Sequence, residues 1–295
     1  MIYTISDLEQ LSGVHSHTIR IWEQRYNALK PKRSRGNTRL YDDSQLKRLL
    51  NIVSLNQSGL KISKICSLSD QAVEALLDQQ YNYHSDDDLA EFYITRLIKF
   101  SLDFNDAAFI SLISDCVDVM GVPQTYRRVT YPLLVRLGLM WRKDEICPAH
   151  EHFISNLIRQ KLFTEINNSK TVRNDGKTWL LFLPEDEDHD IGLIFANYML
   201  RLNHQKVIYL GSKVPLDSVK EVFANIDVDH VLLFMVRSRL EASAQDYVML
   251  LSEVCKTAKI HLAGNSMVIE KLKNIDHINW FKTLEEFEKS IQNPN

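Results

Sequence analysis

The chain has 295 residues, which is more than one hydrophobic core usually spans, so we expect two or three domains. Its hydrophobic fraction of 45% is ordinary for globular protein, and no apolar run approaches the roughly 18 residues of a membrane span. No segment resembles a signal peptide, so we expect a cytoplasmic protein without a membrane partner. The net charge is −3, yet residues 1–70 hold 11 Lys and Arg against 6 Asp and Glu. A basic head on an acidic remainder favours a polyanionic partner for the head alone, with chance variation of surface charge as the alternative.

Cysteine usage argues against zinc and disulfide chemistry. The four cysteines lie far apart, and none of them forms a C-x-x-C pair. Structural zinc sites and disulfide frameworks depend on closer or recurring spacings. We therefore expect reduced cysteines that behave as small hydrophobic residues.

The beginning of the head predicts a helix-turn-helix. Three apolar residues share one face of a short helix, and Gly13 interrupts it. A second helix is predicted to begin near His15 or Ser16 and to end at Pro31. In such a motif the second helix enters a major groove about 12 Å wide. The predicted outward side chains of this helix are His17, Thr18, Arg20 and Arg25.

A wing is predicted after the helix pair. The polar turn "SRGNTR" at 34–39 has Gly36 and Asn37 at its tip, and Asp42 or Asp43 is expected to cap a further amphipathic helix. Arginines that neutralise phosphates add salt-dependent affinity without reading sequence. The flanking arginines are Arg33, Arg35 and Arg39. A solvated helical hairpin without a nucleic-acid partner is the alternative interpretation.

Three strings distinguish this head: "IRIWEQRY" at 19–26, "GNTRLY" at 36–41 and "GLKISKI" at 59–65. On these strings, residues 1–72 resemble the MerR family of winged-helix DNA-binding domains. The resemblance implies double-stranded DNA as the partner, in a promoter or operator, with RNA polymerase as a further partner. It implies DNA contacts from Thr18, Arg20 and Arg25 on the recognition helix, from Arg35 and Arg39 on the wing, and a supporting phosphate contact at Tyr41.

Residues 73–168 are predicted to form a four-helix bundle. The segment "DDDLAEFYITRLIKFSL" begins with acidic residues that favour a helix N-terminus and continues with an apolar stripe. Short connections to three further helical segments indicate a bundle. Trp141 ends one segment, and Glu151 and His152 open the next. By themselves these three residues are better explained as a packed tryptophan and surface polar groups than as a site.

The strings "GLMW" at 138–141 and "AHEHF" at 149–153 place nine residues between a tryptophan and a Glu-His pair. This spacing resembles the helical bundle of cobalamin-dependent, light-responsive MerR-type regulators. The resemblance implies that Trp141 covers the upper face of the cofactor, over the adenosyl group, and that Glu151 and His152 line its pocket. Arg142 departs from the family, whose light sensors have at this position a histidine that ligates cobalt after photolysis.

Residues 177–295 alternate between apolar runs and helical segments, the latter expected near 190–203, 215–225, 241–257, 266–274 and 283–291. Five short runs predict strands: "TWLLFLP", "KVIYLG", "HVLLFMV", "KIHLAG" and "INWF". Such alternation predicts a five-stranded parallel sheet of flavodoxin-like α/β form, so the fold class as a whole is multidomain: an all-α winged helix-turn-helix, a bundle and this sheet. Ligands bind such sheets beyond the carboxyl ends of the strands, where "EDEDHDIG" at 185–192 follows the first strand. A solvated acidic loop is the alternative, whereas a metal site made from this loop alone, or a phosphorylation-receiver site, fits the spacing poorly.

Glu187, His189 and Gly192 have the spacing Glu-x-His-x-x-Gly. A protruding imidazole can reach a metal, and a carboxylate two residues earlier can accept its other N–H and fix the tautomer. The pattern resembles the signature of cobalamin-binding domains, which implies adenosylcobalamin or methylcobalamin as cofactor and His189 as the lower ligand of cobalt. The further matching positions in this part of the chain are Leu210, Gly211 and Gly264.

Two positions depart from that family. It has 41 residues between the motif glycine and a serine that contacts the dimethylbenzimidazole tail, and here the position of that serine is Phe234. Ser238 would replace it only if the loop were shifted by four residues. A glycine pair after the fourth strand is here Ala263-Gly264. A phenyl ring in the tail channel removes both volume and a hydroxyl.

The preferred hypothesis is a transcription regulator without catalytic turnover. Cobalamin between the bundle and the C-terminal domain would control its DNA binding or its assembly as a homodimer or homotetramer, with a possible light response. The first alternative keeps the DNA function and makes the C-terminal domain a cobalamin-free module for oligomerisation or protein partners. The remote alternative is a subunit of a corrinoid methyltransferase or mutase, which would leave the head unexplained.

Overall fold

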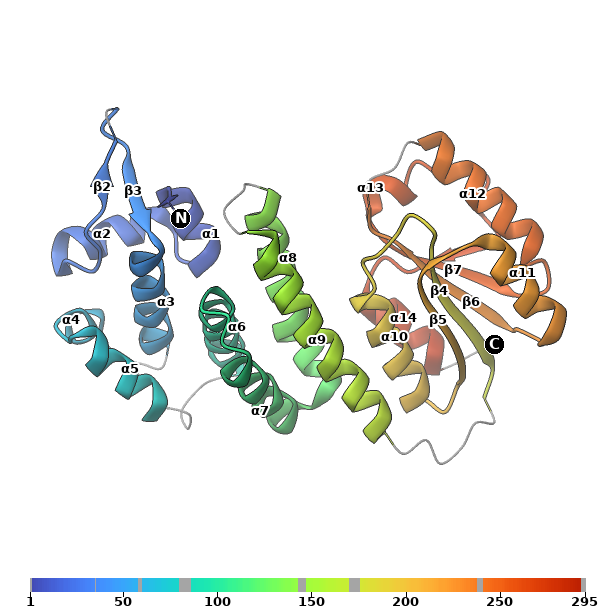
Figure 1. The fold of residues 1–295 in the computed structure, drawn as a ribbon, viewed down its shortest axis with the longest axis horizontal. Coiled ribbons are helices and arrows are strands. Elements are labelled where there is room, and N and C mark those ends of the chain that lie inside the picture. The colour runs from blue at the N-terminus through green and yellow to red at the C-terminus, as the bar shows by residue number, and fades with distance from the viewer. Residues whose placement is uncertain are drawn as a thin grey trace. The chain divides into compact units, whose positions relative to one another are not determined.

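The computed structural model describes residues 2–34, 36–57, 60–79, 86–142, 147–169, 176–237 and 241–292. The chain divides into two compact units, residues 1–158 and 159–295 (Figure 1). The finer division at residues 72 and 168 stays a prediction. Within the described ranges, no helix combines the length and the apolar character that crossing a membrane requires.

The first unit opens with the helix-turn-helix and the wing. Its three short strands form an antiparallel sheet in the order β1-β3-β2, so the head that we expected to be all-α also contains a small sheet. The elements are β1 (Ile2–Tyr3), α1 (Ile5–Ser12), α2 (Ser16–Tyr26), β2 (Lys32–Arg33), β3 (Arg39–Asp42), α3 (Asp43–Gln57), α4 (Ile62–Cys66) and α5 (Asp70–Gln79).

Local side chains set the ends of these helices. A capping box starts α1, in which Thr4 and Asp7 each accept a hydrogen bond from the other's backbone N–H. Gly13, with φ of +71°, ends α1 in the left-handed conformation that glycine adopts readily. Asn27 ends α2 in the same way, with φ of +52°. The predicted stop at Pro31 was therefore wrong, because the left-handed residue turns the chain four positions earlier.

The bundle follows as α6 (Asp86–Leu102), α7 (Asp106–Thr125), the π-helical turn η1 (Tyr126–Thr130), α8 (Tyr131–Arg142) and α9 (Pro148–Asn168). Helix α6 packs against both α3 and α7. Gly121, with φ of +75°, breaks the path of α7 before Pro123. The predicted apolar stripe of α6 is confirmed, since Phe92, Leu97 and Ile98 are buried.

The second unit contains a five-stranded sheet in the order β5-β4-β6-β7-β8, with every pairing parallel. This confirms the predicted flavodoxin-like architecture. Its elements are β4 (Thr178–Pro184), α10 (Ile191–Leu202), β5 (Lys206–Val214), α11 (Leu216–Asn225), β6 (His230–Met235), α12 (Glu241–Val254), β7 (Lys259–Gly264), α13 (Ser266–Ile269), β8 (Ile278–Trp280) and α14 (Leu284–Gln292). Strand β4 is buried along all seven residues, as expected for a central strand with helices on both faces.

The two faces of this sheet have different cores. Aliphatic residues fill the space between the sheet and helices α11, α12 and α13. Side chains alternate along the strands, so Trp179, His230 and His261 lie on the other face. There the two imidazoles are buried with Nδ1 of His230 2.9 Å from Nε2 of His261, and the Trp179 indole stacks on both. Burial lowers the pKa of both histidines.

The strand order reverses direction at β4. The chain moves from β4 to β5 on one side and then crosses to β6 on the other side. In open parallel sheets such a switch point leaves a crevice beyond the carboxyl ends of the two diverging strands. The loops that follow β4 and β6 therefore form the expected ligand-binding edge.

Candidate functional site

Glu187 anchors the loop between β4 and α10. Its side chain is fully buried. Oε1 accepts hydrogen bonds from the backbone N–H groups of Asp188 and His189 at 3.1 and 3.2 Å. Oε2 accepts from the backbone N–H groups of Val236 and Arg237 at 2.9 and 2.7 Å. The carboxylate therefore fastens this loop to the chain that leaves β6.

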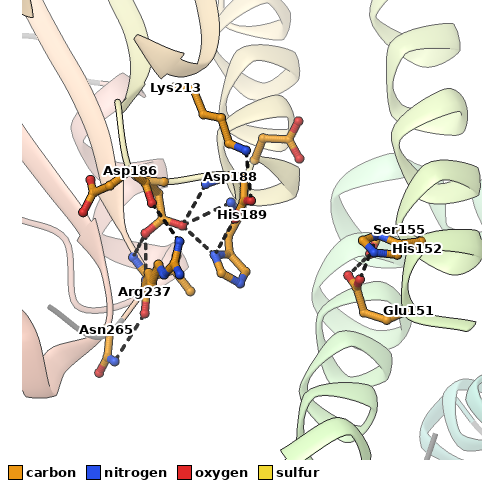
Figure 2. Close-up of polar contacts among 12 residues, drawn as sticks. Glu151, His152, Ser155, Asp186, Asp188, His189, Lys213, Arg237 and Asn265 are labelled. Atoms are coloured by element: carbon orange, nitrogen blue, oxygen red, sulfur yellow. Dashed lines mark hydrogen bonds and ion pairs between the residues drawn. The ribbon is translucent and has the colours of Figure 1, made fainter. Parts of the chain in front are cut away.

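The same carboxylate orients His189. Nδ1 of His189 lies 2.5 Å from Oε1 of Glu187, and about half of the imidazole side chain remains exposed (Figure 2). A carboxylate partner places the ring proton on Nδ1 and the lone pair on Nε2, which is the arrangement of a metal-binding histidine. Burial raises the pKa of Glu187, but hydrogen bonds from His189, Arg237 and Val236 outweigh it, and the pKa is about 2. The pair therefore combines an ionised buried carboxylate with a held imidazole.

The last residues of β5 run beside this pair. The backbone N–H of Lys213 donates to the carbonyl of Glu187 at 3.2 Å, and its Nζ lies 3.4 Å from a carboxylate oxygen of Asp188 (Figure 2). Leu210 is partly exposed, and Gly211 has φ of +85° where the pairing of β4 with β5 shifts register. These two predicted cofactor-binding residues thus lie in β5, three and two positions before Lys213, which contacts the loop that carries His189.

Gly192 lies in the first turn of α10, and the ring of Phe234 packs on it. A Cβ atom built on Gly192 would lie 2.8 Å from Cε1 of Phe234. Phe234 is half-buried and precedes the last residue of β6. The sequence predicted that a phenyl ring replaces a serine at this position, and the structure places that ring beside the motif glycine.

Gly264 ends β7 at a close backbone approach. Its φ is +122°, and a Cβ built there would lie 2.3 Å from the carbonyl oxygen of Met235. The next residue, Asn265, donates its backbone N–H to the same carbonyl at 2.7 Å. No side chain fits at Gly264, so the glycine has a structural reason in addition to the predicted cofactor contact.

The predicted bundle residues lie at the start of α9 and the end of α8. The carboxylate of Glu151 accepts a hydrogen bond from the Ser155 hydroxyl at 2.7 Å and lies 3.3 Å from Nδ1 of His152 (Figure 2). His152 is mostly exposed. The side chains of Trp141 and Arg142 lie outside the described residues. Ser155 was not predicted, and its spacing of four residues from Glu151 on one helix face is the signal that identifies it.

In the head, α2 presents two exposed arginines. Arg20 and Arg25 are exposed, whereas Thr18 is partly buried. Ile19 and Trp22 are buried, as the helix period predicts. The surface opposite this buried face therefore carries the cationic groups expected of a recognition helix.

The two predicted DNA contacts on β3 meet an acid on that helix. Arg39 donates from Nε to Oε2 of Glu23 at 3.0 Å, and the Tyr41 hydroxyl donates to the other oxygen of Glu23. Glu23 and Tyr41 are both buried. Sequence reasoning missed Glu23, because its partners lie 16 and 18 residues away and no local period marks them. Arg35 lies outside the described residues.

Comparison with protein families gives matches in two parts of the chain. Residues 3–71 match the family described as MerR HTH family regulatory protein. Residues 93–164 match the family described as B12 binding domain. The chain carries a MerR-type helix-turn-helix domain and a B12-binding domain. The predicted resemblance is thereby confirmed for the head, by the match at 3–71, and for a B12-binding domain, by the match at 93–164 in the helical region.

Two curated relatives align with most of the chain. The chain is 27% identical over 248 residues to the HTH-type transcriptional repressor CarH of Myxococcus xanthus, covering 83% of this chain and 81% of the repressor. It is 26% identical over 241 residues to the HTH-type transcriptional repressor CarA of the same organism, covering 81% of this chain and 78% of the repressor. Both relatives are named as transcriptional repressors, and neither name describes an enzyme.

A solved structure shares the fold. A monomethylamine corrinoid protein from Methanosarcina barkeri superposes with a TM-score of 0.50 at 18% identity, covering 67% of this chain and 95% of that protein. At this identity the likeness concerns the fold. The match of residues 93–164 to the B12 binding domain supports cobalamin as the cofactor.

The residues of the second unit fit a cobalamin at His189 and leave little space for it beside Gly192. A half-exposed imidazole with a buried carboxylate partner has the donor chemistry of a cobalt ligand. The three acidic and imidazole groups Glu187, Asp188 and His189 lie close enough together to hold a metal, but a loop that offers adjacent ligands suits a ring-bound metal with one protein ligand better than a free ion. The space beside Gly192 is filled by Phe234.

Proposed function

We propose that the chain is a transcription regulator whose DNA binding or oligomerisation is controlled by a cobalamin coordinated through His189. The observation that carries the proposal is the 2.5 Å contact between Nδ1 of His189 and the buried carboxylate of Glu187. When bound, cobalamin supplies a cobalt centre with an exchangeable upper ligand. Homology with two transcriptional repressors supports the regulatory function.

The chain's own residues would act as follows. Glu187 keeps the proton of His189 on Nδ1 and so directs the Nε2 lone pair outward. Further proposed cofactor-binding residues are Gly192, Leu210, Gly211 and Gly264 at the sheet edge and Trp141, Glu151 and His152 in the bundle. Arg142, in place of a histidine, makes the response of the chain to light a separate question from cofactor binding.

The head would bind double-stranded DNA as part of an oligomer. Arg20 and Arg25 on α2 are the exposed cations of the recognition helix. The remaining proposed contacts are Thr18, Arg35, Arg39 and Tyr41. A homodimer or homotetramer would place several heads on repeated half-sites, which multiplies the affinity of a single head.

Phe234 favours a second candidate. Its ring fills the space beside Gly192, so the C-terminal domain could serve oligomerisation or protein partners without a cofactor. This candidate keeps the regulatory function of the head. The two candidates differ in whether the purified chain retains a corrinoid.

A binding experiment separates them. The full chain is mixed in the dark with adenosylcobalamin or methylcobalamin, desalted, and examined by visible spectroscopy. If the proposal holds, the wild type keeps the cobalamin spectrum after desalting and His189→Asn loses it. The control His204→Asn keeps the spectrum; it alters an exposed histidine in a turn of the same unit, where φ is +61°, a conformation that asparagine also adopts. A colourless wild-type protein contradicts the proposal and favours the cofactor-free candidate.

The regulatory step is tested on the same samples. Size-exclusion chromatography and DNA binding are measured with and without cobalamin, in the dark and after illumination. The proposal predicts that the cofactor changes the oligomer size or the DNA affinity of the wild type and leaves His189→Asn unchanged. Equal behaviour of wild type and variant, with cofactor retained by the wild type, would show binding without control.

A further inference from the structure

Phe234 lies at the edge of the sheet where the strand order reverses and where open parallel sheets generally have a crevice. It lies next to the end of β6, and its Cε1, Cδ1 and Cζ atoms lie 2.8, 3.2 and 3.4 Å from the position of a Cβ on Gly192. Gly192 belongs to the first turn of α10, directly after the loop that carries His189. A phenyl ring therefore fills the space that the missing side chain of Gly192 leaves at the ligand-binding edge.

The backbone that carries this ring is held in place. The residues immediately after β6, Val236 and Arg237, donate their N–H groups to the buried Glu187 carboxylate. Met235 accepts a hydrogen bond from Asn265 N–H at 2.7 Å. Because these bonds fix the chain on the carboxyl side of Phe234, the ring can leave Gly192 only by turning about its own side-chain bonds.

Coordination by a histidine makes this crevice important. In free cobalamin the lower position of cobalt is taken by a benzimidazole nucleotide that is covalently tethered to the corrin ring. A histidine that takes this position displaces the base, and the tether keeps the base on the same side of the ring as the histidine. The displaced base then needs space in the protein close to His189, where Phe234 lies against Gly192.

We propose that Phe234 is a specificity-determining residue that selects corrinoids by the size of their lower nucleotide. A corrinoid without this nucleotide, of the cobinamide class, then binds more tightly than cobalamin. The proposal rests on the proposed coordination by His189. It adds that the ring discriminates between two cofactors which offer the same cobalt centre and the same corrin.

The test compares two corrinoids on the full chain. Wild-type protein is titrated with aquocobalamin and with aquocobinamide, and dissociation constants are obtained from changes in visible absorbance. We expect cobinamide to bind at least about tenfold more tightly, the scale of discrimination that a single steric misfit in a pocket provides. Phe234→Ser and Phe234→Ala should reduce this ratio to within about threefold by strengthening cobalamin binding.

A control and the opposite outcomes complete the design. Phe223→Ser alters another partly buried phenylalanine, which lies on α11 against the opposite face of the sheet, and should leave the ratio unchanged. Wild-type protein that binds cobalamin as tightly as cobinamide, or a ratio that Phe234→Ser does not alter, overturns the inference and leaves coordination by His189 standing. Failure of wild type and variants to bind either corrinoid overturns both this inference and the proposed function. Weaker binding of cobalamin than of cobinamide by the wild type, with the difference removed in Phe234→Ser, supports the inference.

Discussion

Replacing Glu187 by glutamine should release the loop that carries His189. The buried carboxylate accepts five contacts: four backbone N–H groups and Nδ1 of His189. Glutamine has the same size but only one acceptor oxygen. Whichever way the amide turns, its NH₂ group replaces one carboxylate oxygen. At least two N–H groups that donate to that oxygen in the wild type then lose their acceptor.

The magnitude follows from the number of bonds lost. Hydrogen bonds to a charged group contribute about 1.5–3 kcal/mol each, so the loss of two corresponds to about 3–6 kcal/mol. Arg237 is exposed and water can replace part of its bond, so we expect the lower end, about 3 kcal/mol. At about 1.4 kcal/mol for each factor of ten, the amides of Val236 and Arg237 should exchange with solvent about 100-fold faster.

Amide hydrogen exchange of the full chain measures this effect locally. The amides to compare are those of Val236 and Arg237 in wild type and Glu187→Gln. The matched control is Asp188→Asn, because Asp188 is half exposed and faces Lys213 at 3.4 Å, an arrangement expected to contribute less than about 1 kcal/mol. Exchange in Glu187→Gln within about threefold of wild type would refute the reasoning that the carboxylate holds the two segments together.

Three further predictions concern other parts of the chain. Burial lowers the pKa of His230 and His261, so below pH about 6.5 the unfolded chain binds more protons than the folded chain, and the free energy of unfolding should fall by up to about 1.4 kcal/mol per pH unit for each histidine. Urea unfolding between pH 7 and 5 should show a shallower fall in His261→Asn than in the wild type, and an equal fall would contradict this prediction. Arg20→Ala should reduce the slope of log affinity for DNA against log salt concentration by about one, whereas Arg39→Ala should reduce it less because Arg39 is already paired with Glu23. Equal slopes for the two variants in salt-dependent binding assays would count against that pairing. Gly264→Ala should lower the free energy of unfolding by at least about 2 kcal/mol in urea titrations, since φ is +122° and the new methyl group meets a carbonyl oxygen; a neutral result would rule out the close approach.

Most of the architecture could be predicted because its signals are local. The runs at 178–184 and 259–264 coincide with β4 and β7, and the expected helical segments coincide with α10, α11, α12 and α14 within a few residues. The segment expected at 266–274 is helical only over Ser266–Ile269. An apolar run of strand length and a helical period are each encoded within a few neighbouring residues, so they can be recognised without knowing the fold.

The candidate site could be predicted in part. The spacing of Glu187, His189 and Gly192 within one loop predicted a carboxylate that orients an imidazole, and the structure has that contact. The same sequence contains no local sign that Glu187 also holds Val236 and Arg237, which lie 49 and 50 residues further along the chain.

The sequence by itself determined which segments become helices and strands and which histidine follows β4 beside a carboxylate partner. Only the tertiary structure decided what those residues touch. Phe234 reaches Gly192, and Arg39 reaches Glu23, because strand register and helix packing bring them together. Contacts of this kind depend on where whole elements are placed, and a single sequence records the composition of each element but not its neighbours.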